Sequence, residues 1–306
     1  MDDSSDQFTK ETVLSDLKSV LSKATPRDIR IEPFPHVVIH NALPDNEFAI
    51  LSQTYPSIET IAGGEPLKNN TLYLKSALDV IDTPAYSQSW RDFFAYHCSR
   101  EFYSEVIALW QEVLDETHPA IDAQYGKSFA DFTCGIRRPG AEENPANKLE
   151  DIQLDCQFGV NSPVRKVTSV RGPHVDTRYK LFAALLYFRI EGDDSSGGEL
   201  EFYRYCDPAM RYRAGQAVDS EFVKKGPFRA LNRIESKHVE KTQTLSYEPN
   251  TLVMWINSPH AVHGVSPRDV TTSPRRYVNF LGEAYNGVND GFFVTKKRRA
   301  SWFAKG

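Results

Sequence analysis

The chain has 306 residues, of which 40% are hydrophobic and 25% are charged, so it can bury a sizeable core in one large domain or two small ones. Its net charge of -5 argues against an overall positive field that would attract nucleic acid or an acidic membrane. No stretch approaches the roughly 20 apolar residues that a membrane-spanning helix needs. We therefore expect a globular protein of one domain, residues 1–306, that binds neither nucleic acid nor membrane.

The cysteines and the N-terminus bear on the cellular compartment. The first ten residues are acidic and polar, unlike a secretory signal, which begins basic and continues apolar. The four cysteines are widely spaced and include no C-x-x-C pair, so a disulfide framework and a zinc knuckle are both disfavoured. We expect a cytoplasmic protein. The cysteines are Cys98, Cys134, Cys156 and Cys206.

The N-terminal region, residues 1–128, is expected to be mostly helical. Residues 8–23 carry apolar side chains at three- and four-residue spacing, which indicates an amphipathic helix. A short strand is expected at His36 to His40, followed by a helix that Pro44 and Asp45 open. Residues 85–114 contain many aromatic and charged side chains but no glycine or proline, and we expect them to be mainly helical.

From about residue 129 the pattern changes to short runs of β-branched, aromatic and aliphatic residues separated by Gly, Pro, Asn and Asp, which is typical of antiparallel strands and turns. Strands at this spacing suit a barrel or a double-sheet jelly roll. We therefore predict a mainly β fold with α, in which a jelly-roll, cupin-like core (129–290) carries the helical region and ends in a tail (291–306). The basic run at 296–299 is interpreted as a solvated tail. Candidate strands are Leu154 to Val160, Leu181 to Ile190, Glu199 to Tyr205, Thr242 to Tyr247, Leu252 to Ile256 and Tyr277 to Leu281.

Three residues form a candidate metal site. His174 and Asp176 are two residues apart in GPHVDTRYK, so on extended backbone both side chains project from the same face and can bind one ion together. His263, which follows the apolar run LVMWI, is the candidate third ligand. Two neutral imidazoles and one carboxylate are typical of the facial triad of non-haem iron(II) oxygenases. Because H-x-D alone is a common pattern, this hypothesis depends on the surrounding sequence.

Four blocks occur in order between residues 150 and 285, and together they are much more specific than any one of them: GPHVDTRYKLFAALLYFR, GDDSSGGELEFY, HGVSP and RRYVNFL. They resemble the prolyl-4-hydroxylase-like branch of the iron(II)- and 2-oxoglutarate-dependent dioxygenases. The resemblance implies a jelly-roll enzyme that uses Fe(2+), 2-oxoglutarate and O2, with ascorbate as a further candidate cofactor. It also implies hydroxylation of an unactivated C–H bond with release of succinate and CO2. Iron halogenases of this broad type have a small residue in place of the carboxylate ligand, so that halide can bind, and Asp176 therefore argues against a halogenase. Desaturation, ring formation and epimerisation stay open.

The resemblance also implies residues that bind 2-oxoglutarate. In that family a basic residue beyond the distal histidine pairs with the far carboxylate, and Arg276, 13 residues after His263, matches it. An arginine suits this task because its planar fork donates two charge-assisted hydrogen bonds to one carboxylate. Arg275 is the competitor, and since successive strand residues face opposite sides, only one of the two should enter the barrel. We favour Arg276. Tyr187 aligns with a family position whose hydroxyl contacts the same carboxylate, although a tyrosine in an apolar strand is often plain core.

Other polar residues near these motifs have weaker claims. His260 is an alternative ligand, but the H-G-V-x-P pattern begins at His263, so we interpret His260 as a loop residue near the pocket rim. Gln157 and Asn161 are candidates to face the substrate; the alternative is a polar strand face followed by a turn asparagine.

Two other functions stay open. A cupin-type metalloenzyme with zinc or manganese would use similar ligands but would not need 2-oxoglutarate or Arg276. A non-catalytic jelly-roll binding protein would not require the H-x-D pair, the distal histidine and the arginine together. We favour a small-molecule substrate over a protein side chain, and the sequence gives no indication of the oligomeric state.

Overall fold

The computed structural model describes residues 18–119, 121–169, 171–207, 234–286 and 292, and the statements below concern these residues. The helix predicted over residues 8–23 lies mostly outside them, and in its described part residues 20–23 form a turn. The basic run at 296–299 also lies outside them.

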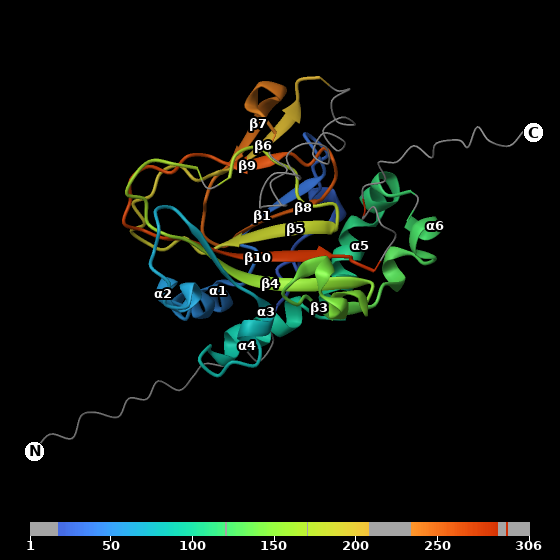
Figure 1. Ribbon diagram of the computed structural model, residues 1–306, viewed down its shortest axis with the longest axis horizontal. Coiled ribbons are helices and arrows are strands. Elements are labelled where there is room, and N and C mark those ends of the chain that lie inside the picture. The colour runs from blue at the N-terminus through green and yellow to red at the C-terminus, as the bar shows by residue number, and fades with distance from the viewer. Residues whose placement is uncertain (1–17, 120, 170, 208–233, 287–291, 293–306) are drawn as a thin grey trace, which may run out of the picture.

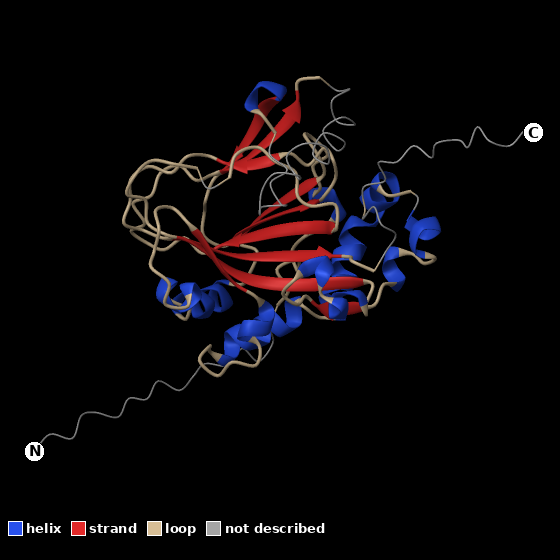
Figure 2. Ribbon diagram, viewed as in Figure 1, coloured by secondary structure: helices blue, strands red, loops and turns tan. Residues whose placement is uncertain are grey.

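A large sheet, which we call the major sheet, forms the main wall of the molecule (Figures 1 and 2). Its seven strands among the described residues follow the order β1-β8-β5-β10-β4-β2, with β3 beside β4. Every pairing is antiparallel except β3 with β4, which is parallel. The strands are β1 (His36–His40), β2 (Leu72–Lys75), β3 (Cys134–Ile136), β4 (Ile152–Asn161), β5 (Lys180–Tyr187), β8 (Thr251–Ile256) and β10 (Arg275–Glu283).

A smaller antiparallel sheet, the minor sheet, lies against one face of the major sheet (Figure 1). It has the order β7-β6-β9, formed by Leu200–Tyr205 (β6), Val239–Leu245 (β7) and His263–Val265 (β9). Phe202 of β6 packs in one cluster with Trp255 of β8. The described strands do not close into a continuous barrel, but the predicted double-sheet core of jelly-roll type is confirmed.

Helices precede most of this core and cover the other face of the major sheet (Figure 2). The predicted helical stretch 85–114 is divided into two helices because the hydroxyl of Ser99 accepts a hydrogen bond from the backbone N–H of Phe102 and starts a new helix there. The α-helices are α1 (Asp45–Gln53), α2 (Ile58–Ala62), α3 (Ala77–Val80), α4 (Gln88–His97), α5 (Arg100–Thr117) and α6 (Ile121–Tyr125). The 3-10 helices are η1 (Pro26–Asp28), η2 (Phe129–Asp131), η3 (Ala141–Glu143), η4 (Pro145–Lys148) and η5 (Ser236–His238).

Aromatic side chains join the helices to the sheet. The ring centroids of Trp90 in α4 and Phe158 in β4 are 4.6 Å apart. Trp110 in α5 donates its indole N–H to the sulfur of Met254 in β8, at 3.4 Å. Strand β4 is buried along all ten residues, and its apolar side chains pack with the helices. None of the described helices is both long and apolar enough to cross a membrane.

The two faces of the major sheet differ in character, and we call the face toward the minor sheet the inner face and the face toward the helices the outer face. On β10, Tyr277 packs with the inner cluster, whereas Val278 and Phe280 pack with the helices. Tyr277 pairs with Gly159 of β4 and with Tyr187 of β5, so these residues share the inner face. The alternation therefore fixes which side chains can reach a site between the sheets.

Candidate metal centre

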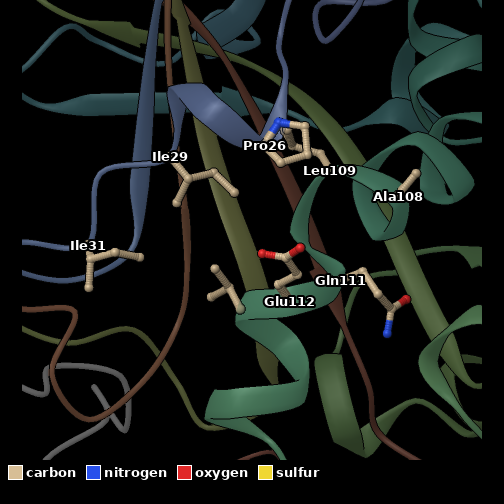
Figure 3. Close-up of a pocket in the computed structure, with 8 residues that line it drawn as sticks. Pro26, Ile29, Ile31, Ala108, Leu109, Gln111 and Glu112 are labelled. Carbon is tan, nitrogen blue, oxygen red and sulfur yellow. The ribbon is translucent and has the colours of Figure 1, made fainter.

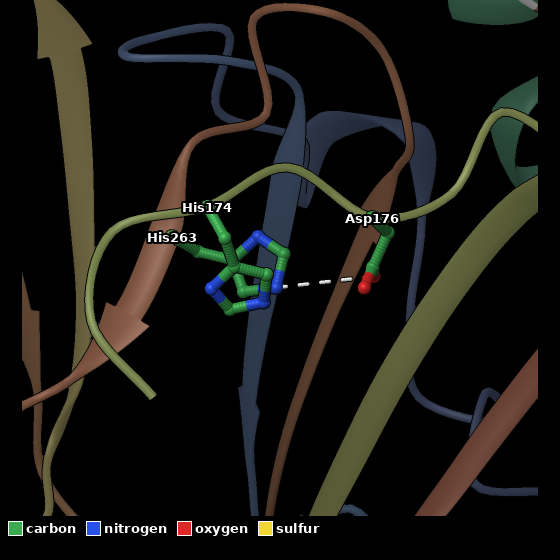
Figure 4. A group of neighbouring side chains, drawn as sticks. All are labelled: His174, Asp176 and His263. Carbon is green, nitrogen blue, oxygen red and sulfur yellow. Dashed lines mark ion pairs between the residues drawn. The ribbon is translucent and has the colours of Figure 1, made fainter. Parts of the chain in front are cut away.

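A pair of backbone hydrogen bonds brings the two predicted histidine ligands together. His174 lies in the segment between β4 and β5, and each backbone N–H of His174 and His263 donates to the carbonyl of the other, at 2.9 Å. The imidazole centroids are 4.2 Å apart. Asp176, two residues on, faces the same point (Figure 4). One ligand atom from each of the three buried side chains lies within 4.8 Å of the others.

Hydrogen bonds orient both imidazoles in the same way. Nδ1 of His174 lies 2.8 Å from the carbonyl of Gly172, and Nδ1 of His263 lies 2.9 Å from the carbonyl of Ala261. Because a carbonyl only accepts, Nδ1 carries the hydrogen in each ring and Nε2 keeps its lone pair. Burial lowers the pKa of both histidines, so the rings are neutral at pH 7. Both Nε2 atoms are therefore available to a metal.

The carboxylate of Asp176 is ionised. Burial alone would raise its pKa, but nearby cations, Lys180 first among them, hold the pKa well below its usual range. Nζ of Lys180 lies 3.2 Å from Oδ2, and Nη1 of Arg171 lies 3.8 Å from Oδ1. Nε2 of His263 lies 3.8 Å from Oδ2 (Figure 4). Two neutral nitrogens and one anionic oxygen at this separation suit a divalent metal such as iron, zinc or manganese.

His260, the alternative ligand, is not part of this group as far as the described residues go. It is half-buried in the loop before β9, and its backbone N–H donates to the hydroxyl of Ser258 at 3.2 Å.

The adjacent arginines at the start of β10 face opposite sides, and the face predicted for Arg276 must be corrected. The guanidinium of Arg276 lies on the outer face, 4.8 Å from the ring centroid of Tyr55, and its Nε donates to the carbonyl of Phe188. Arg275 is the arginine on the inner face, where its guanidinium carbon lies 4.9 Å from the ring centroid of Tyr187. The expectation that only one of the pair enters the space between the sheets holds, but that residue is Arg275.

Arg275 and Tyr187 carry buried donors without partners. In the described part of the chain, Nε and Nη2 of Arg275 lack an acceptor, and the Tyr187 hydroxyl has no partner other than this guanidinium; Nη2 of Arg276, on the outer face, also lacks one. The side chains of Arg275 and Tyr187 are 2% and 0% exposed, so water does not readily replace the missing acceptors. Burial raises the pKa of Tyr187, against the opposing effect of Arg275, so the hydroxyl keeps its proton. Unpaired buried donors are rare in folded proteins, and an anionic ligand with two oxygens would satisfy these.

The inner face is also polar at the end of β10 away from Arg275. Gln157 lies on this face; its Oε1 accepts from Asn279 at 2.9 Å and its Nε2 donates to Asp155 at 2.6 Å. Arg137 lies between two carboxylates, 3.6 Å from Asp155 and 2.6 Å from Glu283. Asn161 is on the same face but at the other end of the strand, where it pairs with Arg275. Apart from Gln157, the side chains at this polar end belong to no sequence motif, and only the strand pairing brings them together.

A separate hollow lies on the outside of the molecule, between η1 and α5 (Figure 3). It contains none of the predicted site residues, and most of its lining is apolar. Its lining residues are Pro26, Ile29, Ile31, Ala108, Leu109, Gln111, Glu112 and Val113.

No family model matches the sequence, and no curated protein is similar to it. The similar solved structures include oxygenases. A Pseudomonas putida prolyl-4-hydroxylase is 12% identical with a TM-score of 0.37, covering 81% of this chain and 92% of that one. A Trichoplax adhaerens prolyl hydroxylase, in complex with a hypoxia inducible factor peptide, is 9% identical with a TM-score of 0.36, covering 81% and 83%.

A third similar structure is the non-heme alpha ketoglutarate dependent epimerase SnoN from nogalamycin biosynthesis, which is 11% identical with a TM-score of 0.39, covering 81% of this chain and 78% of that one. None of these three structures is more than 12% identical to the chain. At TM-scores below 0.5 they assign no role to any residue here, and the chemistry of the site has to be inferred from its own geometry.

Proposed function

We propose that this protein is an iron(II)- and 2-oxoglutarate-dependent oxygenase whose metal ligands are His174, Asp176 and His263. The observation that carries the proposal is the convergence of three buried ligand atoms within 4.8 Å, from two neutral imidazoles and one ionised carboxylate. Three protein ligands leave further coordination positions open for a co-substrate and O2, which is the arrangement of the facial triad.

We assign the anchoring of 2-oxoglutarate to Arg275, together with Tyr187, in place of Arg276. The support is the pair of buried, unpartnered donor groups on the inner face. The planar fork of Arg275 would donate two hydrogen bonds to the far carboxylate, and the Tyr187 hydroxyl a third. Arg276 would meet no ligand there because its side chain lies against Tyr55 on the outer face.

Bound iron, with 2-oxoglutarate and O2, would supply the oxidation of an unactivated C–H bond, with release of succinate and CO2. The protein's own residues would do the rest. The Nδ1 hydrogen bonds of His174 and His263 fix the directions of the ligands, and burial of the site limits access of water. Ascorbate remains a candidate cofactor on the sequence resemblance alone.

We favour a small polar molecule over a protein side chain as the substrate. The support is the polar row on the inner face, where Gln157 lies between Asn279 and Asp155, because polar side chains at fixed positions suit the orientation of a small polar ligand. We further propose one domain, since β1 and β2 of the N-terminal region pair with β8 and β4. Cytoplasmic location is proposed because no cysteine in the described residues is paired.

The deciding experiment is an anaerobic titration of the iron(II)-loaded protein with 2-oxoglutarate, followed by the weak visible charge-transfer band of the chelate. A saturable band is the expected result. Iron binding without a band would favour a cupin-type metalloenzyme that does not use 2-oxoglutarate. Absence of metal binding would favour a non-catalytic jelly-roll binding protein.

A further inference from the structure

Lys180, the first residue of β5, is an internal cation beside the candidate metal centre. Its Nζ lies 3.2 Å from Oδ2 of Asp176, and its side chain is 14% exposed. Glu283 faces Lys180 across the strand pair, but Glu283 is engaged by Arg137 and by Tyr285. Asp176 is therefore the carboxylate that lies within ion-pair distance of Lys180 in the described part of the chain.

The ammonium contacts the oxygen that a metal would need. Oδ2 of Asp176 is also the oxygen 3.8 Å from Nε2 of His263, so we take Oδ2 as the oxygen that faces the metal position. Arg171 approaches the other oxygen, Oδ1, at 3.8 Å. A metal at the centre and the ammonium of Lys180 would thus share one oxygen, and two cations in contact with the same oxygen repel each other strongly at a buried site.

We propose that Lys180 holds the place of the metal's positive charge in the metal-free protein, and that it leaves Asp176 when the metal binds. A buried carboxylate is stabilised by a counter-ion, and Lys180 lies nearer to Asp176 than Arg171 does, so Lys180 supplies most of that stabilisation while the site is empty. Lysine suits this task because its ammonium is a point charge on a flexible stem that can move away, whereas the fork of an arginine holds a carboxylate more rigidly. Lys180 then acts as a positioning residue that stabilises the empty site and weakens metal affinity. The inference rests on the proposed role of Asp176 as a ligand.

Metal affinity gives the first test, without need of a substrate. The metal-free protein is titrated anaerobically with cobalt(II), whose visible bands report binding. Lys180→Met is expected to bind cobalt(II) about tenfold more tightly than the wild type, as expected for loss of a competing ion pair at a mostly buried site. Lys180→Arg keeps the charge and should not gain affinity. The matched control is Lys127→Met, which removes the ammonium 2.9 Å from Asp151 and should leave the affinity unchanged.

The reactivity of the amine gives the second test, because it reports movement directly. Full-length protein is acetylated with an N-hydroxysuccinimide ester, with and without cobalt(II), and the modified lysines are quantified by mass spectrometry. Acetylation of Lys180 should rise several-fold when cobalt(II) is bound, while that of Lys127 stays constant. Unchanged reactivity of Lys180 would overturn the proposal even if Lys180→Met bound more tightly, since Lys180 would then weaken the metal by its charge from a fixed position.

The third test measures melting temperatures, and it can be used even if Lys180→Met folds poorly. For Lys180→Gln, which keeps a hydrogen-bond donor, the melting temperature of the metal-free protein should fall and the rise caused by saturating cobalt(II) should exceed that of the wild type. An equal or smaller rise would contradict the inference.

If the wild type binds cobalt(II) and forms the 2-oxoglutarate band but neither variant binds more tightly, the inference fails and the proposed function stands. Absence of cobalt(II) binding in wild type and variants alike would overturn both.

Discussion

The guanidinium carbon of Arg275 lies 4.9 Å from the ring centroid of Tyr187, on the inner face of the major sheet. Arg275→Met is therefore expected to weaken 2-oxoglutarate binding about a hundredfold, because a buried carboxylate loses a charged donor worth about 2–3 kcal/mol. The charge-transfer titration measures this change. Arg276→Met is the matched control, since it removes the same charge from the outer face. A larger loss in Arg276→Met than in Arg275→Met would return the role to Arg276.

The metal ligands are tested by single substitutions. His174→Ala and Asp176→Ala should each weaken iron(II) binding by more than about a hundredfold, since loss of a direct ligand exceeds the 10- to 100-fold effect of losing an outer-shell partner. Equilibrium dialysis under anaerobic conditions measures the bound metal, and circular dichroism checks the fold. His260→Ala should bind iron(II) nearly as well as the wild type. If it lost as much affinity as His263→Ala, the two histidines would exchange roles.

Gly159 provides a steric test of the 2-oxoglutarate site that removes no charge. A Cβ added there would lie 2.4 Å from Cε2 of Tyr277, so the ring would have to shift. That ring centroid lies 5.3 Å from the guanidinium carbon of Arg275. Gly159→Ala should weaken 2-oxoglutarate binding about tenfold and reduce stability by about 1–3 kcal/mol, while metal binding is retained.

Gly282→Ala is the control for Gly159→Ala, because a Cβ at Gly282 would lie 2.5 Å from Cε1 of Phe182, which packs in the cluster with the helices. Isothermal titration with 2-oxoglutarate compares the two variants. Unaltered affinity in Gly159→Ala would mean that the ring of Tyr277 is not part of the co-substrate site.

His97 should make the stability of the protein depend on pH. It is buried between α4 and the sheet, where its Nδ1 donates to the carbonyl of Phe93 and its Nε2 accepts from the N–H of Val20. Burial lowers the pKa of His97 from 6.5 to about 3. Below pH 6.5 the unfolded state therefore binds a proton that the folded state does not, and the free energy of unfolding falls by about 1.4 kcal/mol per pH unit until the pH nears 3.

Thermal or urea unfolding at pH 7 and pH 5 tests this effect. Between these pH values the free energy of unfolding should fall by about 2 kcal/mol less in His97→Gln than in the wild type, because one buried neutral histidine accounts for about that much. His40→Gln, on the exposed end of β1, is the control. An unchanged pH dependence in His97→Gln would show that His97 binds its proton equally in both states.

The strands that the sequence predicts correctly are those with long apolar or alternating runs between turn residues. β1 matches its predicted bounds, and β4, β5 and β8 differ by a few residues. β2, β3 and β9 were not predicted, because runs of three or four residues show no usable periodicity. Their pairing depends on tertiary contacts, as in the backbone exchange between His174 and His263.

The candidate ligands could be read from sequence because H-x-D fixes two side chains locally. The distance from His263 does not tell which of Arg275 and Arg276 faces the metal, because a loop of irregular backbone lies between His263 and β10 and breaks the alternation of strand faces. A usable signal was present in the strand itself: Arg276 shares its parity with the apolar Val278 and Phe280, which suit a helix-covered face. No sequence pattern predicts the contact between Lys180 and Asp176, since that contact depends on the turn in which the backbone N–H of Lys180 donates to the carbonyl of Thr177.

Alternate residues of strand β4, which is buried on both faces, have different tasks: one set faces the proposed substrate and the other packs against the helices. Asp155, Gln157 and Asn161 point toward the space in which we place the substrate, whereas Cys156, Phe158 and Val160 pack against the helices. Substitutions at the first set would alter which molecules are accepted, and those at the second would alter how firmly the wall is held. A change of substrate range thus requires no rebuilding of the helix-packed face, but each new inner side chain must replace the hydrogen bonds and the ion pair that hold Asp155 and Gln157.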